Sequence, residues 1–376
     1  GTLMQLTELN LSNNVIGNVL PLQSLYNLTA LDLSGNSFID YSQLLPIIAN
    51  NPGLVSLSLA DIAIGDQSLN FLMSPDSQLQ SLNLRNTGLV LMPVVPESVK
   101  ALDLSDNQLM DFFLLPSVQL NQLDISGNPL QNIDLSSLLN SSGLTELDLS
   151  YVDGISLSDV QTIIANNPEL TKLGIAGFPL NSLSDLPLEQ LQNLQWLDVS
   201  ATGVQDIVAV NNFLNLQALY AANNNIEFIQ ELSMLPHLRE LDVSGNRIDN
   251  FSALNQMTRL TVLNLSNNAL TDLSPLLPLI QNNFYLVELG LGGMAINDLG
   301  LLPIFMPESK LQVLDLSNTG ISDIELLRSL TNLRELNLSD NDIEDIYPLD
   351  SLNQLQVLNL SDNEIFDLAP VGTLMQ

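Results

Sequence analysis

Aspartate recurs at one register of a short apolar pattern, and the resulting row of carboxylates is the feature of this chain best able to do chemistry. The segment "LDLSDN" around Asp103 shows the pattern. If such segments are neighbouring parallel strands, their side chains stand ~4.8 Å apart, and the carboxylates form a row. The candidate acidic row comprises Asp103, Asp124, Asp148, Asp198 and Asp242.

Like charges facing each other destabilise a sheet unless water solvates them or a cation bridges them. Calcium, whose protein ligands are oxygens, is one such cation. However, the sequence contains no EF-hand or RTX-type loop. We therefore expect no cofactor and assign no metal site, and we interpret the row as solvated consensus carboxylates, with structural calcium as the open alternative.

Few aromatic side chains stand where a partner would meet them. Trp196 and Tyr220 occupy adjacent repeats of the pattern, and Tyr151 lies two repeats before Trp196. Trp and Tyr dominate the energetics of many protein interfaces. We take Tyr151, Trp196 and Tyr220 as the candidate contact residues, the alternative being incidental surface aromatics.

Composition removes most other classes of function. The chain has no cysteine, one histidine (His237) and no phosphate-loop, nucleophile-elbow or dinucleotide motif, so we name no catalytic residue and expect no enzyme. The formal charge of −33 argues against nucleic acid as a partner. No run approaches ~18 apolar residues, so we expect no membrane insertion.

The elements that position these residues follow from a repeat. The motif LxxLxLxxN, seen in "LTELNLSNN" from Leu6 and "LRELNLSDN" from Leu333, divides 6–376 into sixteen units of 20 to 26 residues. Asn at its ninth position is expected to form an internal ladder whose amides satisfy backbone groups of the turn. The predicted ladder comprises Asn14, Asn36, Asn107, Asn128, Asn224, Asn246, Asn268, Asn341 and Asn363.

This pattern resembles the leucine-rich repeat family over essentially the whole chain. Units such as "LRELNLSDNDIEDIYPLDSLNQ" resemble the 22-residue repeats of bacterial internalins, and the longer units resemble those of ribonuclease inhibitor. The resemblance implies an α/β solenoid, a superhelix of about 16 coils with a parallel β-sheet on its concave face. Family members usually bind their partners on that face.

The convex side should alternate with unit length. Long units carry apolar residues at helical spacing, as in Leu44, Leu45, Ile47 and Ile48, and predict short α-helices there. The 22-residue units predict 3₁₀ turns. Neither terminus shows a cysteine-rich flank or an amphipathic capping helix, so we expect an uncapped solenoid.

A longer period lies within the short one. The ninth-position Asn is replaced by Ile62, Phe178 and Met294, and one unit later by a threonine. The three apolar replacements stand 116 residues apart. We therefore divide the single solenoid domain into a coil tail at 1–5, a single coil at 6–27, and three five-coil blocks at 28–143, 144–259 and 260–376.

The pentapeptide GTLMQ occurs at both 1–5 and 372–376, and in phase with the repeat. Joining Gln376 to Leu6 would continue the solenoid with correct spacing. One hypothesis is therefore a structural unit of a long bacterial fibre or giant adhesin, extracellular or on the cell surface, whose partner is itself, end to end. The alternative is an internalin-like recognition domain that binds a protein on its concave face.

Overall fold

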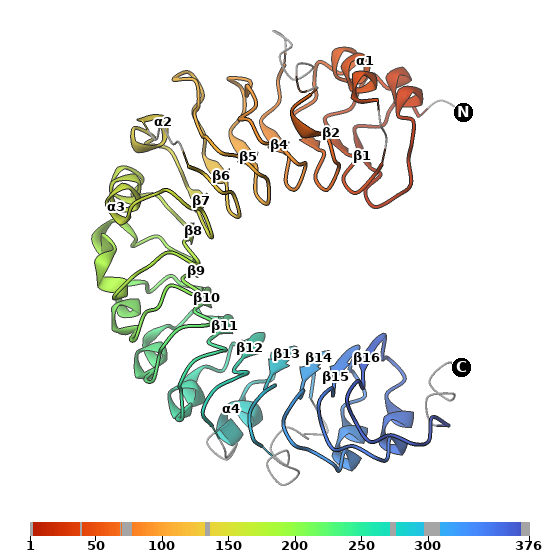
Figure 1. Ribbon diagram of the computed structural model, residues 1–376, viewed down its shortest axis with the longest axis vertical. Coiled ribbons are helices and arrows are strands. Elements are labelled where there is room, and N and C mark those ends of the chain that lie inside the picture. Colours follow the sequence, from red (N-terminus) through yellow and green to blue (C-terminus); the bar gives the residue numbers. More distant parts are fainter. Residues whose placement is uncertain are drawn as a thin grey trace. The chain divides into compact units, whose positions relative to one another are not determined.

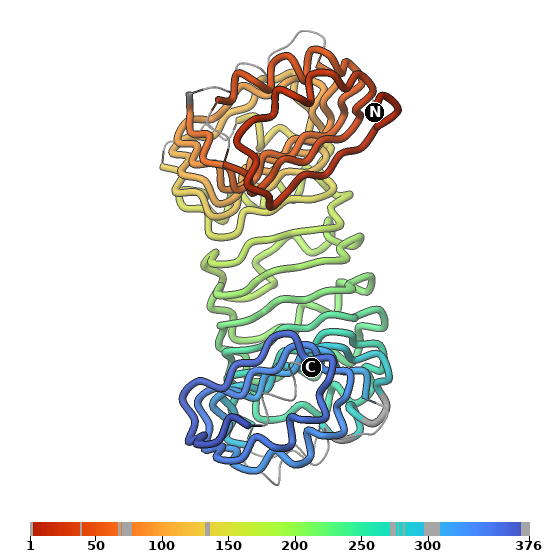
Figure 2. The backbone as a smooth tube through the Cα atoms, turned by 90° about the vertical axis from the view of Figure 1, so that its right-hand side faces the viewer, coloured from red at the N-terminus to blue at the C-terminus, as the bar shows by residue number. Residues whose placement is uncertain are grey.

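The computed structural model describes residues 3–37, 40–67, 69, 77–131, 136–270, 276–296 and 309–369. The chain divides into two compact units, unit 1 (Gly1–Phe178) and unit 2 (Pro179–Gln376). Within each unit, similar coils stack on one another along the chain (Figure 1, Figure 2).

Each predicted repeat contributes one three-residue strand, placed at its third to fifth positions. Neighbouring strands within a unit pair in parallel and in chain order, with matching positions in register. The sixteen predicted coils and the α/β solenoid are thereby confirmed. In unit 1 the strands are β1 Glu8–Asn10, β2 Ala30–Asp32, β3 Ser56–Ser58, β4 Ser81–Asn83, β5 Ala101–Asp103, β6 Gln122–Asp124, β7 Glu146–Asp148 and β8 Lys172–Gly174. In unit 2 they are β9 Trp196–Asp198, β10 Ala218–Tyr220, β11 Glu240–Asp242, β12 Val262–Asn264, β13 Glu288–Gly290, β14 Val313–Asp315, β15 Glu335–Asn337 and β16 Val357–Asn359.

The central leucine of each strand supplies the core, and its two neighbours face outward. In β11, Leu241 is fully buried while Glu240 and Asp242 are partly exposed. Alternation of side chains across a strand produces this pattern. We call the outward-facing surface formed by the third and fifth positions the strand face. A coil cannot bury its own leucines alone, so the core exists only between coils.

The opposite side of each unit carries the helices (Figure 1). The long repeats form α-helices as predicted, and α3 begins with a capping box in which Ser156 and Asp159 bond reciprocally. The α-helices are α1 Leu44–Asn50, α2 Ser136–Leu139, α3 Leu157–Asn166 and α4 Leu277–Asn282. Of these, α2 lies in the repeat from Leu120, for which no helix was predicted. The 3₁₀ helices are η1 Leu20–Ser24, η2 Tyr41–Gln43, η3 Gly65–Gln67, η5 Leu183–Asp185, η6 Leu188–Gln190, η7 Val208–Asn212, η8 Gln230–Met234, η9 Ser252–Gln256, η12 Glu325–Ser329 and η13 Tyr347–Ser351.

The ninth-position asparagines join consecutive coils. The Nδ2 group of Asn246 donates to the carbonyls of Val243 (2.9 Å) and Ser244 (3.1 Å) in its own coil. It also donates to the Ala221 carbonyl of the preceding coil (2.9 Å), whose Ile226 N–H in turn donates to Asn246 Oδ1 (3.0 Å). The same reach into the preceding coil is made by Asn36, Asn107, Asn128, Asn224, Asn268, Asn341 and Asn363, while Asn14 bonds within its own coil.

At two threonine positions of the ladder, Thr87 and Thr202, a backbone bond between coils replaces the asparagine bond. Ile62 and Phe178 are buried and offer no amide. In those coils Gly65 N–H donates to the Thr87 carbonyl (2.9 Å), and Leu180 N–H donates to the Thr202 carbonyl (3.0 Å). The threonine hydroxyl instead bonds within its own coil, as Thr87 Oγ1 does to the Leu84 carbonyl. An apolar residue at the ninth position, followed by threonine at the ninth position of the next coil, therefore goes with a backbone hydrogen bond between the two coils in place of the asparagine bond.

The eighth position of every coil has a left-handed backbone. Its φ angles lie between 50° and 75°, for example in Asn13, Asp106 and Gly127. Glycine adopts this conformation without strain, and Asn and Asp tolerate it best among the other residues. The backbone of the turn thus accounts for the frequent Asn, Asp and Gly at this position.

The described residues do not test the predicted block boundaries or the repeated terminal sequence. The division into blocks 28–143, 144–259 and 260–376 stays a prediction. Gly1, Thr2 and residues 370–376 are outside the described residues, so both copies of GTLMQ fall wholly or partly there. Among the helices of the described residues, none has the length and apolarity needed to cross a membrane.

Removing one ladder amide should destabilise unit 2. Asn246→Ala leaves the Ile226 N–H without its buried acceptor, and we expect a loss of about 2–4 kcal/mol in the free energy of unfolding. Trp196 is the single tryptophan and lies in unit 2, so its fluorescence in a urea titration reports this loss. Asn353→Ala, at an exposed loop position, is the control and should change stability by less than about 0.5 kcal/mol. Equal effects of the two changes would refute the ladder's role.

Candidate functional site

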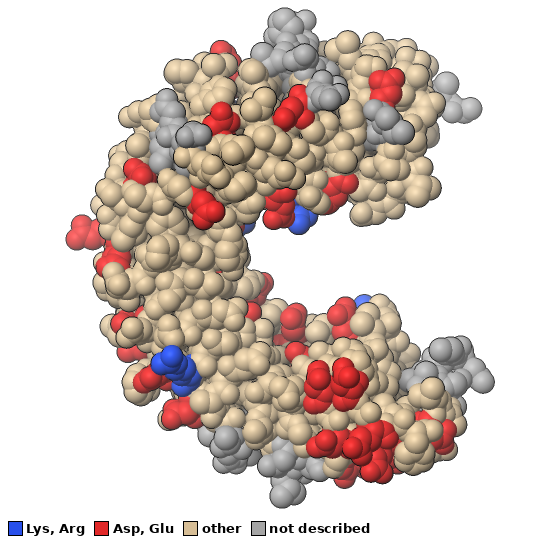
Figure 3. Space-filling model, in the orientation of Figure 1, with Lys and Arg blue, Asp and Glu red and all other residues tan. Residues whose placement is uncertain are grey.

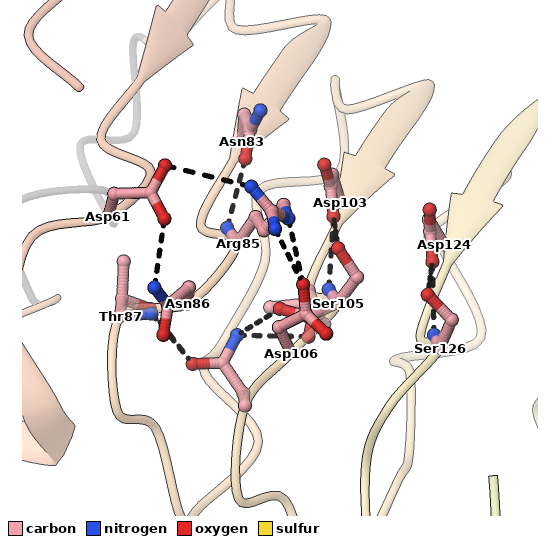
Figure 4. A network of polar contacts seen from close by, with 12 residues as sticks. Asp61, Asn83, Arg85, Asn86, Thr87, Asp103, Ser105, Asp106, Asp124 and Ser126 are labelled. Atoms are coloured by element: carbon pink, nitrogen blue, oxygen red, sulfur yellow. Dashed lines mark hydrogen bonds and ion pairs between the residues drawn. The ribbon is translucent and has the colours of Figure 1, made fainter. Parts of the chain in front are cut away.

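The carboxylate row of unit 1 lies on adjacent strands. Asp103 pairs in register with Asp124, and Asp124 with Asp148. Each of the first two accepts a hydrogen bond at 2.6 Å from the serine two residues later, Ser105 or Ser126 (Figure 4). The backbone N–H of each serine bonds the same oxygen at 3.0 Å. These local bonds hold the carboxylates side by side on the strand face.

Burial of this row differs from the expectation of solvated carboxylates. Asp148 is only 9% exposed, so the prediction was wrong for this residue. Gly174 on the next strand makes the room, because a Cβ there would collide with the carboxylate. Lys172 Nζ lies 3.9 Å from Asp148 Oδ2 and offsets its charge. The hollow over these strands has a volume of about 230 Å³.

Asp124, in the middle of the row, is the group most affected. Burial, followed by the charges of Asp148 and Asp103, raises its pKa from 3.8 to about 6, against the opposing effect of the Ser126 hydrogen bonds. No three His, Cys, Asp or Glu side chains of the described residues are grouped so as to hold a metal ion. The absence of a cofactor stays a prediction, with calcium bridging of the row as its alternative.

Beside this row, Arg85 connects three consecutive coils. Its guanidinium lies 2.8 Å from Asp106 and 3.7 Å from Asp61 (Figure 4). The hydrogen bond to Asp106 raises the pKa of Arg85. All three side chains are nearly half exposed, so these pairs add little stability. They do neutralise part of the acidic surface of unit 1.

In unit 2 the structure brings two predicted contact residues together. The ring centroids of Trp196 and Tyr220 are 5.4 Å apart with an interplanar angle of 44°. Tyr220 Oη donates to Glu240 Oε2 at 2.5 Å. Burial and this bond raise the pKa of Tyr220. Both rings are partly exposed on the strand face, and a small Ala218 pairs with Trp196 on the neighbouring strand.

Tyr151 belongs to unit 1 and differs from Trp196 and Tyr220 in its exposure and its backbone conformation. It is 60% exposed and occupies the left-handed eighth position with φ 54°. This conformation is strained for a bulky residue. Its ring lies over Gly177, where a Cβ would approach the ring to 2.6 Å. The chain therefore keeps an exposed tyrosine at a position where glycine, asparagine or aspartate would be easier to accommodate.

The remaining acidic-row residues, Asp198 and Asp242, flank Tyr220 on β9 and β11. Each accepts the backbone N–H of the serine two residues later at 2.8 Å. Because Tyr220 stands between them, they do not form a continuous carboxylate row with each other. Sequence reasoning missed Glu240 and Lys172. The signal that could have found both is a charge at the third repeat position, on the strand next to a candidate residue at the fifth position and diagonal to it.

Comparisons with known proteins agree with this architecture. A family model described as Leucine Rich repeats (2 copies) matches 214–256, 236–278, 309–350 and 331–370, and one described as Leucine Rich repeat matches 3–19. The chain belongs to the leucine-rich repeat family. No curated protein sequence matches it significantly.

Among solved structures of this leucine-rich repeat fold, an internalin (InlF) from Listeria monocytogenes is 26% identical, with a TM-score of 0.53 over 94% of this chain and 86% of the internalin. A leucine-rich repeat protein from Leptospira interrogans is 25% identical, with a TM-score of 0.55 over 95% of this chain and 90% of that protein. TLR13, solved in complex with ssRNA13, shares the fold at 22% identity and a TM-score of 0.55, over 98% of this chain and 57% of TLR13.

The buried row should make unit 1 sensitive to pH. Asp124 has its pKa raised from 3.8 to about 6 in the folded state, so folding favours its protonated form. Its contribution is fully present below pH ~4 and is lost as pH rises through about 6, by up to about 3 kcal/mol. Asp124→Asn should therefore stabilise the protein at pH 7.5 and hardly change it at pH 4, as followed by circular dichroism during urea unfolding. Asp367→Asn removes a charge from an exposed site and serves as control; the same pH-dependent gain there would contradict this assignment.

Proposed function

We propose that the chain is a non-enzymatic recognition domain that binds a protein partner through its strand face, outside the cell or on a bacterial cell surface. The partly exposed Trp196–Tyr220 pair carries the proposal. Large aromatic side chains held rigidly on a polar surface are typical anchors of protein interfaces. The hydrogen bond from Tyr220 to Glu240 restrains one ring, so less side-chain entropy is lost on binding.

Two further observations support this proposal. The full-length likeness to an internalin and to a Leptospira leucine-rich repeat protein favours a bacterial recognition module. Charge opposes nucleic acid as the ligand, since acidic side chains are spread over the visible surface and basic ones occur at few places (Figure 3). The leucines and ladder asparagines are committed to the core, which leaves the strand face able to vary for recognition.

Site-specific photo-crosslinking tests this proposal. A benzoyl-phenylalanine replaces Val262 on β12 in one variant and Met234 in η8, 61% exposed on the helix side, in the other. Each variant is incubated with surface proteins of the source bacterium and of the cells that this bacterium contacts, and is then irradiated. We expect several-fold more of one specific adduct from position 262. Equal adducts from both positions, or more from 234, would remove the strand face as the binding surface.

A second candidate function rests on the in-phase GTLMQ sequences at 1–5 and 372–376. We propose that the unit also continues head to tail, from Gln376 to Leu6, in a longer array or fibre. The acidic surface favours solubility of such an assembly. This candidate is compatible with recognition, because stacking uses the ends of the coils and leaves the strand face open.

Protein isolated from its natural source distinguishes units joined by a peptide bond from separate chains that stack end to end. Cleavage after glutamate would release the junction peptide IFDLAPVGTLMQLTE, from Ile365 through Gln376 and Leu6 to Glu8, if units are joined by a peptide bond. Mass spectrometry should detect it, and electron microscopy should show threads whose repeat matches sixteen coils. Threads without the peptide indicate stacking of separate chains. If neither the junction peptide nor the threads are found, the proposed array is wrong.

A further inference from the structure

The strand face of unit 2 carries carboxylates at a regular interval. At the third position of the repeat, which is the first residue of each strand, glutamate and valine alternate from β11 to β16, in register. Glu240, Glu288 and Glu335 therefore stand on every second strand, roughly 10 Å apart. The positions between and beyond them are Val262, Val313 and Val357.

Within the described part of unit 2, no lysine or arginine forms an ion pair with these three glutamates. The ion pairs there join Arg328 to Glu325 (2.9 Å) and Asp350 (2.6 Å), in and beside the 3₁₀ helices. Burial raises the pKa of Glu288, and the charges of Glu335, Asp242 and Glu240 raise it further. In unit 1, by contrast, the third repeat position on β8 is Lys172, which lies beside Asp148. The glutamates of unit 2 thus repel one another without an internal cation.

The aromatic pair stands at one end of this glutamate series. Trp196, Ala218 and Glu240 occupy the same position on β9, β10 and β11, and Tyr220 projects from β10 on the same face. Ala218, which stands between Trp196 and Glu240 in this register, is buried. Tyr220 bonds only one oxygen of Glu240, and a carboxylate offers a second oxygen to a guanidinium or ammonium group.

We propose that this surface binds an extended cationic segment of the protein partner, laid across the strands, a proposal that rests on the function proposed above. One Arg or Lys stacks on the Trp196 ring and pairs with Glu240, and the next two pair with Glu288 and Glu335. The valines between the glutamates contact the aliphatic stems of these side chains. Charge complementarity and the aromatic pair select this partner over a neutral one.

The glutamate interval also predicts the spacing of the partner's cations. A polyproline-II segment has three residues per turn and rises about 3.1 Å per residue, so every third side chain projects to one side at roughly 9 Å. This interval matches two strand spacings of the sheet. The partner segment should therefore carry Arg or Lys at every third residue.

Trp196 provides the reporter for the test, because it is the only tryptophan. Two probe peptides of equal composition and charge are titrated at 150 mM salt: acetyl-RPPRPPRPP-amide and acetyl-RRRPPPPPP-amide. We expect the first to change Trp196 fluorescence and to bind at least about fivefold more tightly than the second. A neutral tetrasaccharide, maltotetraose, should give no change.

Variants then locate the binding. Glu240→Gln together with Glu288→Gln should weaken the first peptide by roughly threefold to twentyfold, since exposed ion pairs contribute modestly. Trp196→Ala, measured by calorimetry, should weaken it by roughly fivefold to thirtyfold. Glu344→Gln removes a charge from an exposed loop position and should leave affinity within twofold. Circular dichroism confirms that each variant is folded.

Three outcomes overturn the proposal: equal affinity for the two peptides, equal weakening by Glu344→Gln, or a response to maltotetraose alone. The first two indicate unspecific attraction to an acidic protein, and the third indicates a glycan ligand. If neither peptide binds while crosslinks still form mainly at position 262, recognition through the strand face stands and the proposal of a cationic partner is wrong. Failure of both experiments removes the recognition function itself.

Discussion

The hydrogen bonds of the ninth-position asparagines are the interaction on which the rest of the structure depends. A single coil has turn carbonyls and N–H groups that lie inside the protein, where water cannot reach them. One amide, such as that of Asn246, satisfies three carbonyls and one N–H across two coils. Leaving these groups unpaired would cost more than the burial of a single leucine returns. The stacked leucines supply the attraction between coils, and the ladder sets their register.

Register in turn determines what the strand face presents. Because each strand pairs position for position with its neighbour, side chains twenty or more residues apart in sequence become adjacent. Tyr220 meets Glu240 in this way, and Asp124 is enclosed by Asp103 and Asp148. The two units use this constraint differently. In unit 1, internal cations offset the carboxylates, and burial raises the pKa of Asp124. In unit 2, a series of glutamates stays open to solvent beside two aromatic rings.

The departures from the repeat consensus have separate physical origins. The apolar residue and the following threonine, as at Ile62 and Thr87, replace a side-chain bond between coils with a backbone bond. Glycine at 174 opens space for a neighbouring carboxylate. Tyr151 has no such structural benefit, since it holds a left-handed backbone and remains exposed. Exposed strain of this kind is typical of residues kept for contact rather than for folding.

The sequence by itself determined the number of coils, the position of every strand, the helices of the long repeats and the identity of the ladder asparagines. It could do so because each depends on a short local pattern that recurs many times. The tertiary structure alone decided which aspartates are buried and which aromatic rings meet. For Asp148 the answer depends on Gly174 and Lys172 in the next coil, and for Tyr220 it depends on Glu240. Burial and pairing are set by the side chains of the adjacent coil, and a motif read one coil at a time does not contain them.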